Sequence, residues 1–177
     1  MFNLFKKKGD SVKVIDKIWM TQQAKLNGII QEWQKDKDLI IITWFIDTNR
    51  LLTDLFSKES ASLAPVLMAR ETHRPQIGNR PVIFAEHHPL RSKEQAAFRQ
   101  WQLTEAVVYS AMDEPLFMHF GSERITGLMK QLGMQDDNVI EHSMISSSIE
   151  NAQQKIEKKV ITEQSANSQK EWMERNL

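Results

Sequence analysis

The sequence contains no cysteine and no excess of charge of either sign. Without cysteine, the chain cannot form disulfides, thiolate metal sites or a cysteine nucleophile. Its 177 residues include 23 Lys plus Arg and 23 Asp plus Glu, so no overall electrostatic field attracts nucleic acid or an anionic membrane. We therefore expect no nucleic-acid partner, because any such binding would have to be local.

Long hydrophobic runs are also missing. A transmembrane helix needs roughly 20 consecutive apolar residues, whereas the longest apolar run here covers only residues 39–42. The first eight residues, MFNLFKKK, place their apolar side chains before the lysines and lack a secretory h-region and cleavage site. We expect a frayed N-terminus and a soluble, cytoplasmic protein. Weak peripheral contact of residues 1–8 with an anionic membrane surface is the alternative.

Motifs for catalysis are missing as well. No G-x-x-x-x-G-K-[ST] motif occurs, so the sequence lacks the backbone cradle, the lysine and the Mg²⁺-binding hydroxyl of a P-loop. No Ser/His/Asp arrangement can be assembled by spacing, and Ser146 to Ser148 stand at a predicted helix start, where capping explains them. The sequence predicts no catalytic residues and no cofactor.

The sequence does contain apolar strands that alternate with amphipathic helices. Residues 39–45, LIIITWF, are β-rich and apolar without alternation, as is typical of a strand covered on both faces. Residues 65–69, 82–86 and 106–111 are expected to form further strands. Because helices of about ten residues separate them, right-handed crossovers predict an α/β sandwich with a mainly parallel sheet of about four strands.

Polar residues mark the expected helix starts. Thr21, Asp47 and Ser122 stand where N-caps are needed, each just before an apolar stripe at helical spacing. Ser92 with Gln95 has the spacing of a capping box. These signals predict helices between the strands and after the last one.

The C-terminal part carries one narrow apolar seam. From Ser146, a predicted helix places apolar residues at spacings of three and four, with Glu, Gln and Lys on its opposite face. One narrow stripe predicts one partner surface, and two bulky apolar residues follow near the end of the chain. We predict contact with a protein partner, or with a second copy in a homo-oligomer, through Ile149, Ala152, Ile156, Val160, Trp172 and Met173.

Several short segments of the sequence, at separate positions, resemble segments of one protein family. FGSERI at 120–125, LMKQLGM at 128–134, IEHSM at 140–144 and IENAQQK at 149–155 resemble the end of the second RecA-like nucleotide-binding domain of the SecA preprotein translocase motor, where it leads into the helical scaffold. MTQQAK at 20–25, residues 39–52, VIFAEHH at 82–88 with Arg91, and residues 107–114 resemble earlier parts of that domain. The resemblance covers about residues 20–158, with gaps.

The resemblance implies a three-layer RecA-like fold and a division of the chain. The expected parts are an N-terminal tail at 1–17, the RecA-like domain at 18–134, and a linker with a C-terminal helical extension at 135–177. It also implies that the missing P-loop belongs to the motor's other RecA-like domain, which has no counterpart in this sequence.

The departures from the family bear on activity. The Gly- and Arg-rich segment that faces nucleotide in the motor is missing, and AFRQW at 97–101 stands where its arginine fingers would lie. An arginine finger contributes roughly 10³ to 10⁵ in rate, so we predict that this chain does not hydrolyse ATP alone. The resemblance leaves residual nucleotide or phosphate contact open at Glu86, Arg91 and Arg99.

Neighbouring histidines raise a metal hypothesis. His87 and His88 follow Glu86, but adjacent strand residues point to opposite faces unless the backbone turns before Pro89. No further ligand stands at metal spacing, so structural histidines are favoured and no metal is predicted. Glu86 and Arg91 could equally form an ordinary loop ion pair.

Three functional hypotheses follow. The leading one is a non-catalytic, SecA-like module that binds protein in or beside preprotein translocation, with a translocase component as its partner. The second is the second lobe of a composite ATPase that a separate P-loop chain completes. The third is a structural or regulatory binding protein with no present link to translocation.

Overall fold

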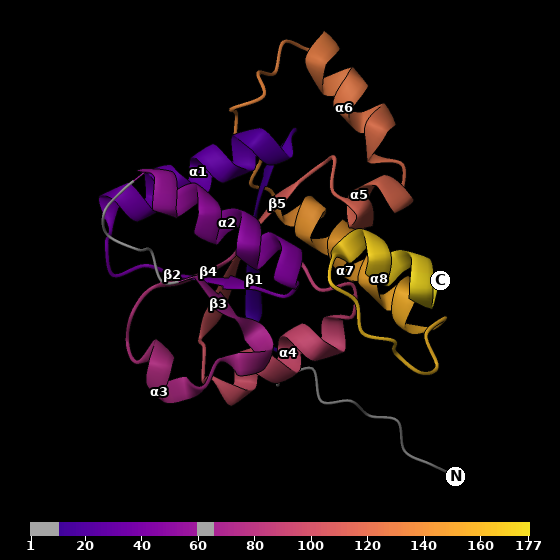
Figure 1. The fold of residues 1–177 in the computed structure, drawn as a ribbon. Helices are drawn as coiled ribbons and strands as arrows, with labels where there is room; N and C mark the ends of the chain where they lie inside the picture. The colour runs from indigo at the N-terminus through magenta and orange to yellow at the C-terminus, as the bar shows by residue number, and fades with distance from the viewer. Residues whose placement is uncertain (1–10, 60–65) are drawn as a thin grey trace.

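The computed structural model describes residues 11–59 and 66–177 and shows a parallel sheet between two layers of helices (Figure 1). The sheet has five strands, all parallel, in the order β1-β5-β4-β2-β3. Their bounds are β1 (Lys13–Trp19), β2 (Ile40–Thr43), β3 (Val66–Met68), β4 (Val82–Phe84) and β5 (Glu105–Ala111). The predicted α/β class is confirmed, and the architecture is consistent with a RecA-like domain.

The strand count differs from the expected four because of β1, whose first five residues lie in the range 1–17 that was expected to be a tail. Its sequence, KVIDKIW, interrupts apolar residues with charges and carries no strong strand signal. Pairing with β5 defines it as a strand, in register from Lys13 opposite Glu105 to Trp19 opposite Ala111. As an edge strand, β1 has a sheet neighbour on one side, so charged side chains are tolerated there.

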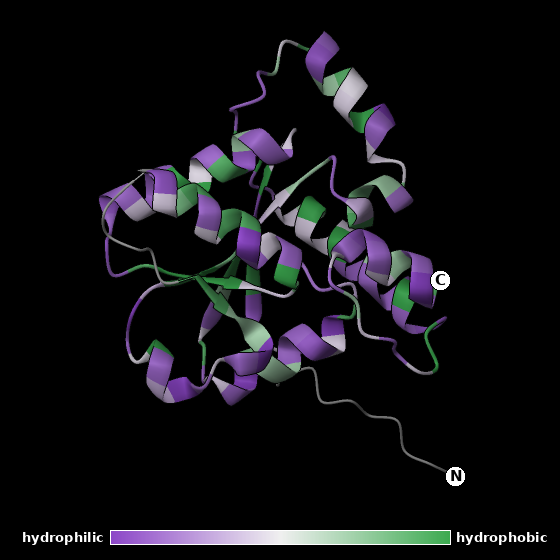
Figure 2. Cartoon of the chain, in the orientation of Figure 1, coloured by the Kyte–Doolittle hydropathy of each residue, from purple (hydrophilic) through white to green (hydrophobic). Residues whose placement is uncertain are grey.

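The helices cover both faces of the sheet. α1 (Gln22–Lys35) and α2 (Ile46–Glu59) lie on one face, where Ile29, Trp33 and Phe56 pack against the strands. The other face is covered by the short 3₁₀ helix η1 (Ala69–Glu71), α3 (Arg74–Ile77) and α4 (Arg91–Gln100). Every residue of β2 is buried, as its unbroken apolar sequence predicted. Figure 2 shows the hydrophobic strands enclosed by helices with polar outer surfaces.

The predicted helix starts were partly right. Thr21 is the N-cap of α1, and its side chain accepts a hydrogen bond from the Ala24 N–H. The capping box at Ser92 is wrong, because α4 begins at Arg91 and Gln95 instead exchanges two hydrogen bonds with the Val12 backbone. Ser122 lies inside the first turn of its helix, after a Gly121 N-cap, and Asp47 likewise lies inside the first turn of α2. These three helices therefore begin one or two residues earlier than predicted.

The C-terminal helices return to the domain. α5 (Pro115–His119), α6 (Ser122–Gln131), α7 (Ser143–Glu157) and α8 (Gln169–Asn176) follow β5. α7 begins at Ser143, three residues before the expected start, because the His142 side chain caps it. α7 and α8 lie together beside α5, whereas α6 stands away from them (Figure 1). Within the described residues, no helix is long and apolar enough to cross a membrane.

The predicted seam packs within the chain. Ile149 contacts Ile18 and Met112, and Ile156 and Trp172 join a cluster with Phe45, Leu90 and Leu116, on whose margin Val160 and Met173 lie. The surface that covers the seam is therefore the chain's own domain. Contact with another protein through the buried Ile149, Ile156 and Trp172 would require α7 and α8 to leave that domain, whereas Ala152, Val160 and Met173 are half-buried.

Candidate functional site

Buried polar residues gather where the parallel strands end. We call this the carboxyl edge, formed by the segments that follow β2, β4 and β5 at 44–45, 85–90 and 112–114. Ligands of open parallel α/β sheets bind outside this edge. The Glu86-His87-His88 segment follows β4 directly, and all three side chains are buried. The carboxyl edge is therefore the candidate functional site.

Glu86 occupies the N-terminal end of α2. One carboxylate oxygen accepts the N–H groups of Trp44 and Phe45, each at 3.0 Å, and the other accepts the Thr48 hydroxyl at 2.6 Å. Burial raises the pKa of Glu86 to about 7, against the lowering effect of Lys25 and these donors. A helix N-terminus is a ready anion site, and here the chain's own carboxylate fills it.

A buried ion pair lies beside Glu86. The Lys25 ammonium donates to the Ala85 carbonyl at 2.7 Å and to Oε1 of Glu114. Burial raises the pKa of Glu114, although Lys25 opposes that rise. Two buried carboxylates, Glu86 and Glu114, thus face one buried ammonium.

His87 bridges two further carboxylates. Its Nε2 lies 2.8 Å from Asp16 Oδ1 and its Nδ1 lies 2.9 Å from Glu94 Oε1. Ionised carboxylates only accept hydrogen bonds, so both contacts are satisfied when both ring nitrogens carry protons. Burial alone would lower the pKa of His87, but Glu94 and Asp16 raise it to about 10. Burial alone would raise the pKa of Asp16, but His87, together with Ser146 and Arg91, lowers it overall. The group is an imidazolium held between two anions.

His88 faces a different carboxylate. Its Nδ1 accepts the Leu90 N–H at 3.0 Å, and its Nε2 lies 3.3 Å from Glu163 Oε1. Glu163 also accepts the Trp172 indole N–H at 2.8 Å and pairs with Lys93. The hydrogen bond from His88, with those from Lys93 and Trp172, lowers the pKa of Glu163 to about 2. The two histidines thus serve separate contacts, and among the described residues no His, Asp and Glu group is placed to hold a metal.

Two glutamines fasten the C-terminal helices to this edge. Gln153 of α7 donates to the His88 carbonyl at 2.8 Å and to Glu94 Oε2 at 2.9 Å. Gln169 of α8 donates to the His87 carbonyl at 3.0 Å and accepts the Leu116 N–H at 2.8 Å. The chain's own α7 and α8 therefore cover the edge at which other α/β proteins bind ligands.

The residues predicted for phosphate contact do not converge. Glu86 is buried in the network just described, and Arg91 pairs with Glu150 at 3.3 Å with its side chain 19% exposed. Arg99 is exposed near the other end of α4, eight residues and therefore about 12 Å along the helix axis from Arg91. The alternative of an ion pair between Glu86 and Arg91 is not what the structure shows, because each has other partners.

Sequence reasoning missed Asp16, Lys25, Glu94, Gln153 and Glu163. Three of them left a signal, because each stands on the apolar stripe of its helix: Lys25 lies four residues before Ile29, Glu94 four before Phe98, and Gln153 four after Ile149. A polar residue on such a stripe is buried with a partner or disrupts packing. Asp16 left no such signal, because its partner His87 lies 71 residues away, and Glu163 stands on no predicted helix.

The fold and this edge define a class of protein, a parallel α/β domain consistent with a RecA-like architecture whose carboxyl edge is closed by its own C-terminal helices. No protein-family model matches the chain. The chain is distantly similar to one region of the protein translocase subunit SecA, as the short segments FGSERI, LMKQLGM, IEHSM and IENAQQK predicted.

The SecA of Desulfotalea psychrophila is 36% identical over 183 residues, which cover 80% of this chain and 21% of that protein. The SecA of Oleidesulfovibrio alaskensis is 26% identical over 182 residues, with the same two shares. A shorter stretch of 49 residues is 51% identical to the SecA of Acidithiobacillus ferrooxidans. The chain spans about a fifth of the length of the first two relatives.

Proposed function

We propose that this chain is a cytoplasmic, SecA-related module that binds another protein in or beside preprotein translocation and does not hydrolyse ATP by itself. The similarity to protein translocase subunits supports the setting. The observation that carries the non-catalytic part is the closed carboxyl edge, where Glu86 fills the N-terminal end of α2 and α8 lies across the opening.

Electrostatics at this edge disfavours a phosphate group. A phosphate at the N-terminal end of α2 would lie next to the Glu86 carboxylate, with Glu114 close by. Two unit charges 4 Å apart repel by about 4 kcal/mol at an effective dielectric constant near 20. A helix N-terminus offers typically 0.3 to 1 kcal/mol to an anion. Above the Glu86 pKa of about 7, the repulsion from its carboxylate exceeds the attraction of the helix N-terminus, although the neighbouring Lys25 ammonium offsets part of it.

We place the partner contact on α6 rather than on the covered seam. Ile125 and Leu128 lie on this helix and Leu132 is its C-cap; all three are exposed, Leu128 by 57% and Leu132 by 76%. Contiguous exposed apolar residues of this kind mark protein interaction sites. The occupant we propose is an apolar helix of a translocase component, because the exposed face of α6 is apolar and its sequence includes parts of FGSERI and LMKQLGM, which resemble SecA.

Affinity capture from native cells tests this contact. We expect the wild-type chain to retain a translocase component and the Leu128→Glu variant to lose it. Ile161→Glu is the matched control, because Ile161 is 99% exposed outside α6. Retention of a different complex, with no translocase component, would favour the structural or regulatory alternative.

ATP turnover separates the proposal from a composite ATPase. The purified chain is mixed with Mg-ATP, alone and with SecA from the same cell. We expect no turnover by the chain alone and no rate that depends on Arg91 or Arg99. Turnover that appears only in the mixture and disappears with Arg91→Ala or Arg99→Ala would refute the binding-module proposal and support the second-lobe alternative.

A further inference from the structure

A cavity of about 210 Å³ lies between α5, α6 and α7, where α6 stands away from the other two helices (Figure 1). The buried side chains of Met112, Leu116 and Ile149 line it, together with the half-buried Phe117 and Met129. Phe117 and Met129 pack against the hydrophobic cluster that contains Met112 and Ile149. Apart from two serines, every residue that lines the cavity is apolar, and none is charged.

The two serines of the lining, Ser122 and Ser148, already use their hydroxyl protons. The Ser122 hydroxyl donates to the Met112 carbonyl, and the Ser148 hydroxyl donates to the Met144 carbonyl at 2.8 Å. A buried water needs two to four polar partners, and the other side chains of the lining offer none. The cavity therefore suits an apolar occupant better than ordered water.

The size and the lining of the cavity favour an aromatic ring. An apolar cavity of about 150 Å³ can stay dry and bind benzene, so about 210 Å³ admits a ring with one small substituent. Aromatic rings pack well against other rings and against methionine sulfur, and Phe117, Met112 and Met129 provide both. Phe120 and Ile125 also line the cavity and are 40% and 48% exposed, so a ligand can enter from solvent past them.

We propose that this cavity binds one neutral aromatic group of about the size of toluene. The ligand contacts α6 and α7 at once and removes exposed apolar surface of Phe120 and Ile125 from water. Ile125 also belongs to the surface proposed for the protein partner. Binding of a free ligand needs no partner, however, so either proposal can fail without the other.

The test is an NMR titration of the full chain, followed at the methyl groups of Met112 and Met129. The probe is toluene, and the comparison compound is N-methylpyridinium chloride, whose cation has the same shape as toluene and carries a charge. We expect a saturable shift with toluene and at least about tenfold weaker binding of N-methylpyridinium, because an apolar lining cannot replace the hydration of a charge. Equal binding of both compounds, or no saturable shift with toluene, would overturn the proposal.

Two variants of α7 locate the effect. Ala152→Leu should weaken toluene binding at least about tenfold, because Ala152 lines the cavity and a larger side chain fills part of it. Asn151→Leu should leave the binding unchanged, because Asn151 is exposed on the same helix and does not line the cavity. Unchanged binding by Ala152→Leu would overturn the proposal. If that variant does not fold, the comparison of the two compounds on the wild-type chain decides alone.

A third compound distinguishes the source of the aromatic ring. N-acetyl-phenylalanine amide, with both backbone ends capped, represents a phenylalanine side chain of a partner protein. Tighter binding of this compound than of toluene identifies a partner's side chain, and equal or weaker binding identifies a free small molecule. Either result supports the aromatic ligand site, whereas binding of neither compound contradicts it.

Discussion

The stability of this fold should fall as the pH rises through the alkaline range, and His87 should be the reason. The imidazolium lies fully buried between Asp16 and Glu94, which raise its pKa from 6.5 to about 10. A group whose pKa is raised by folding contributes in full below its unfolded pKa, and the contribution is lost as the pH rises toward the folded pKa. The relevant window for His87 therefore runs from about pH 6.5 to about pH 10.

The expected magnitude follows from that pKa rise. It corresponds to about 5 kcal/mol in total and to about 1.4 kcal/mol per pH unit within the window. Removal of one partner from a buried charge pair costs about 3 to 5 kcal/mol, which agrees with this value. Because whole domains are stable by about 5 to 15 kcal/mol, the effect is large enough to measure.

Urea unfolding at a series of pH values between about 7.5 and about 9.5 provides the assay. The raised pKa values of Glu86, about 7, and of Tyr109, about 12, lie outside this range, whereas burial also raises the pKa of Glu114, so a His87 variant is needed to assign the slope. We expect the unfolding free energy of the wild type to fall by about 2 to 3 kcal/mol over the range. His87→Gln should be less stable at neutral pH and should lose this slope.

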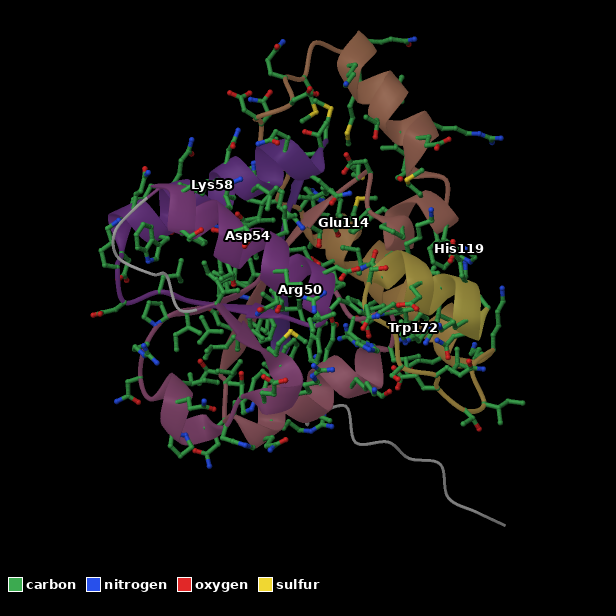
Figure 3. All side chains as sticks on the ribbon, viewed as in Figure 1. Arg50, Asp54, Lys58, Glu114, His119 and Trp172 are labelled. Atoms are coloured by element: carbon green, nitrogen blue, oxygen red, sulfur yellow. The ribbon has the colours of Figure 1, made fainter. Side chains whose placement is uncertain are left out.

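His119→Gln is the matched control, because His119 is exposed on α5 (Figure 3). It should keep both the stability and the slope of the wild type. A flat wild-type profile between about pH 7.5 and about pH 9.5 would mean that His87 is neutral in the folded protein and would refute the argument. The same slope in wild type and His87→Gln would assign it to another group.

Three further substitutions probe the packing around the site. Trp172→Ala should weaken the packing of α8 on the domain by about 3 to 5 kcal/mol, because the side chain is buried. Hydrogen exchange of the variant should then be faster in α8 than in the sheet. Gln153→Leu should destabilise by about 1 to 3 kcal/mol in urea unfolding, since Oε2 of Glu94 and the His88 carbonyl both lose the donor that Gln153 supplies, whereas the exposed Gln154→Leu should have little effect. Gly28→Ala should lower the thermal midpoint, because its Cβ would lie 2.5 Å from the Trp19 ring, an overpacking worth about 1 to 3 kcal/mol.

The α/β class was predictable from local pattern. β3 and β4 are apolar along their whole length and β2 is apolar except for its last residue, Thr43, while the helices between strands carry one apolar stripe, so the alternation of the two identifies the class. β1 escaped detection because its charges break that pattern. Its strand conformation depends on pairing with β5, about 90 residues later in the chain.

The candidate site was predictable only in location. The Glu86-His87-His88 segment stands after a predicted strand, and its polarity marked it as a place of interest. The partners of these side chains were not predictable, because Asp16 lies 71 residues from His87 and Gln153 lies 65 residues from His88. No local spacing rule connects residues at such separations.

Three features could be read from the sequence by itself, because each depends on neighbouring residues. They are the alternation of strands and helices, the lack of a P-loop motif, and the short segments that resemble SecA. Tertiary structure alone decided what covers the seam of α7 and where the charges lie. Trp172 is buried because Phe45, Leu90 and Leu116 come from three separate segments to form its pocket. The burial of His87 and its pKa depend on Asp16 and Glu94, and only the folded chain brings these carboxylates next to the imidazole.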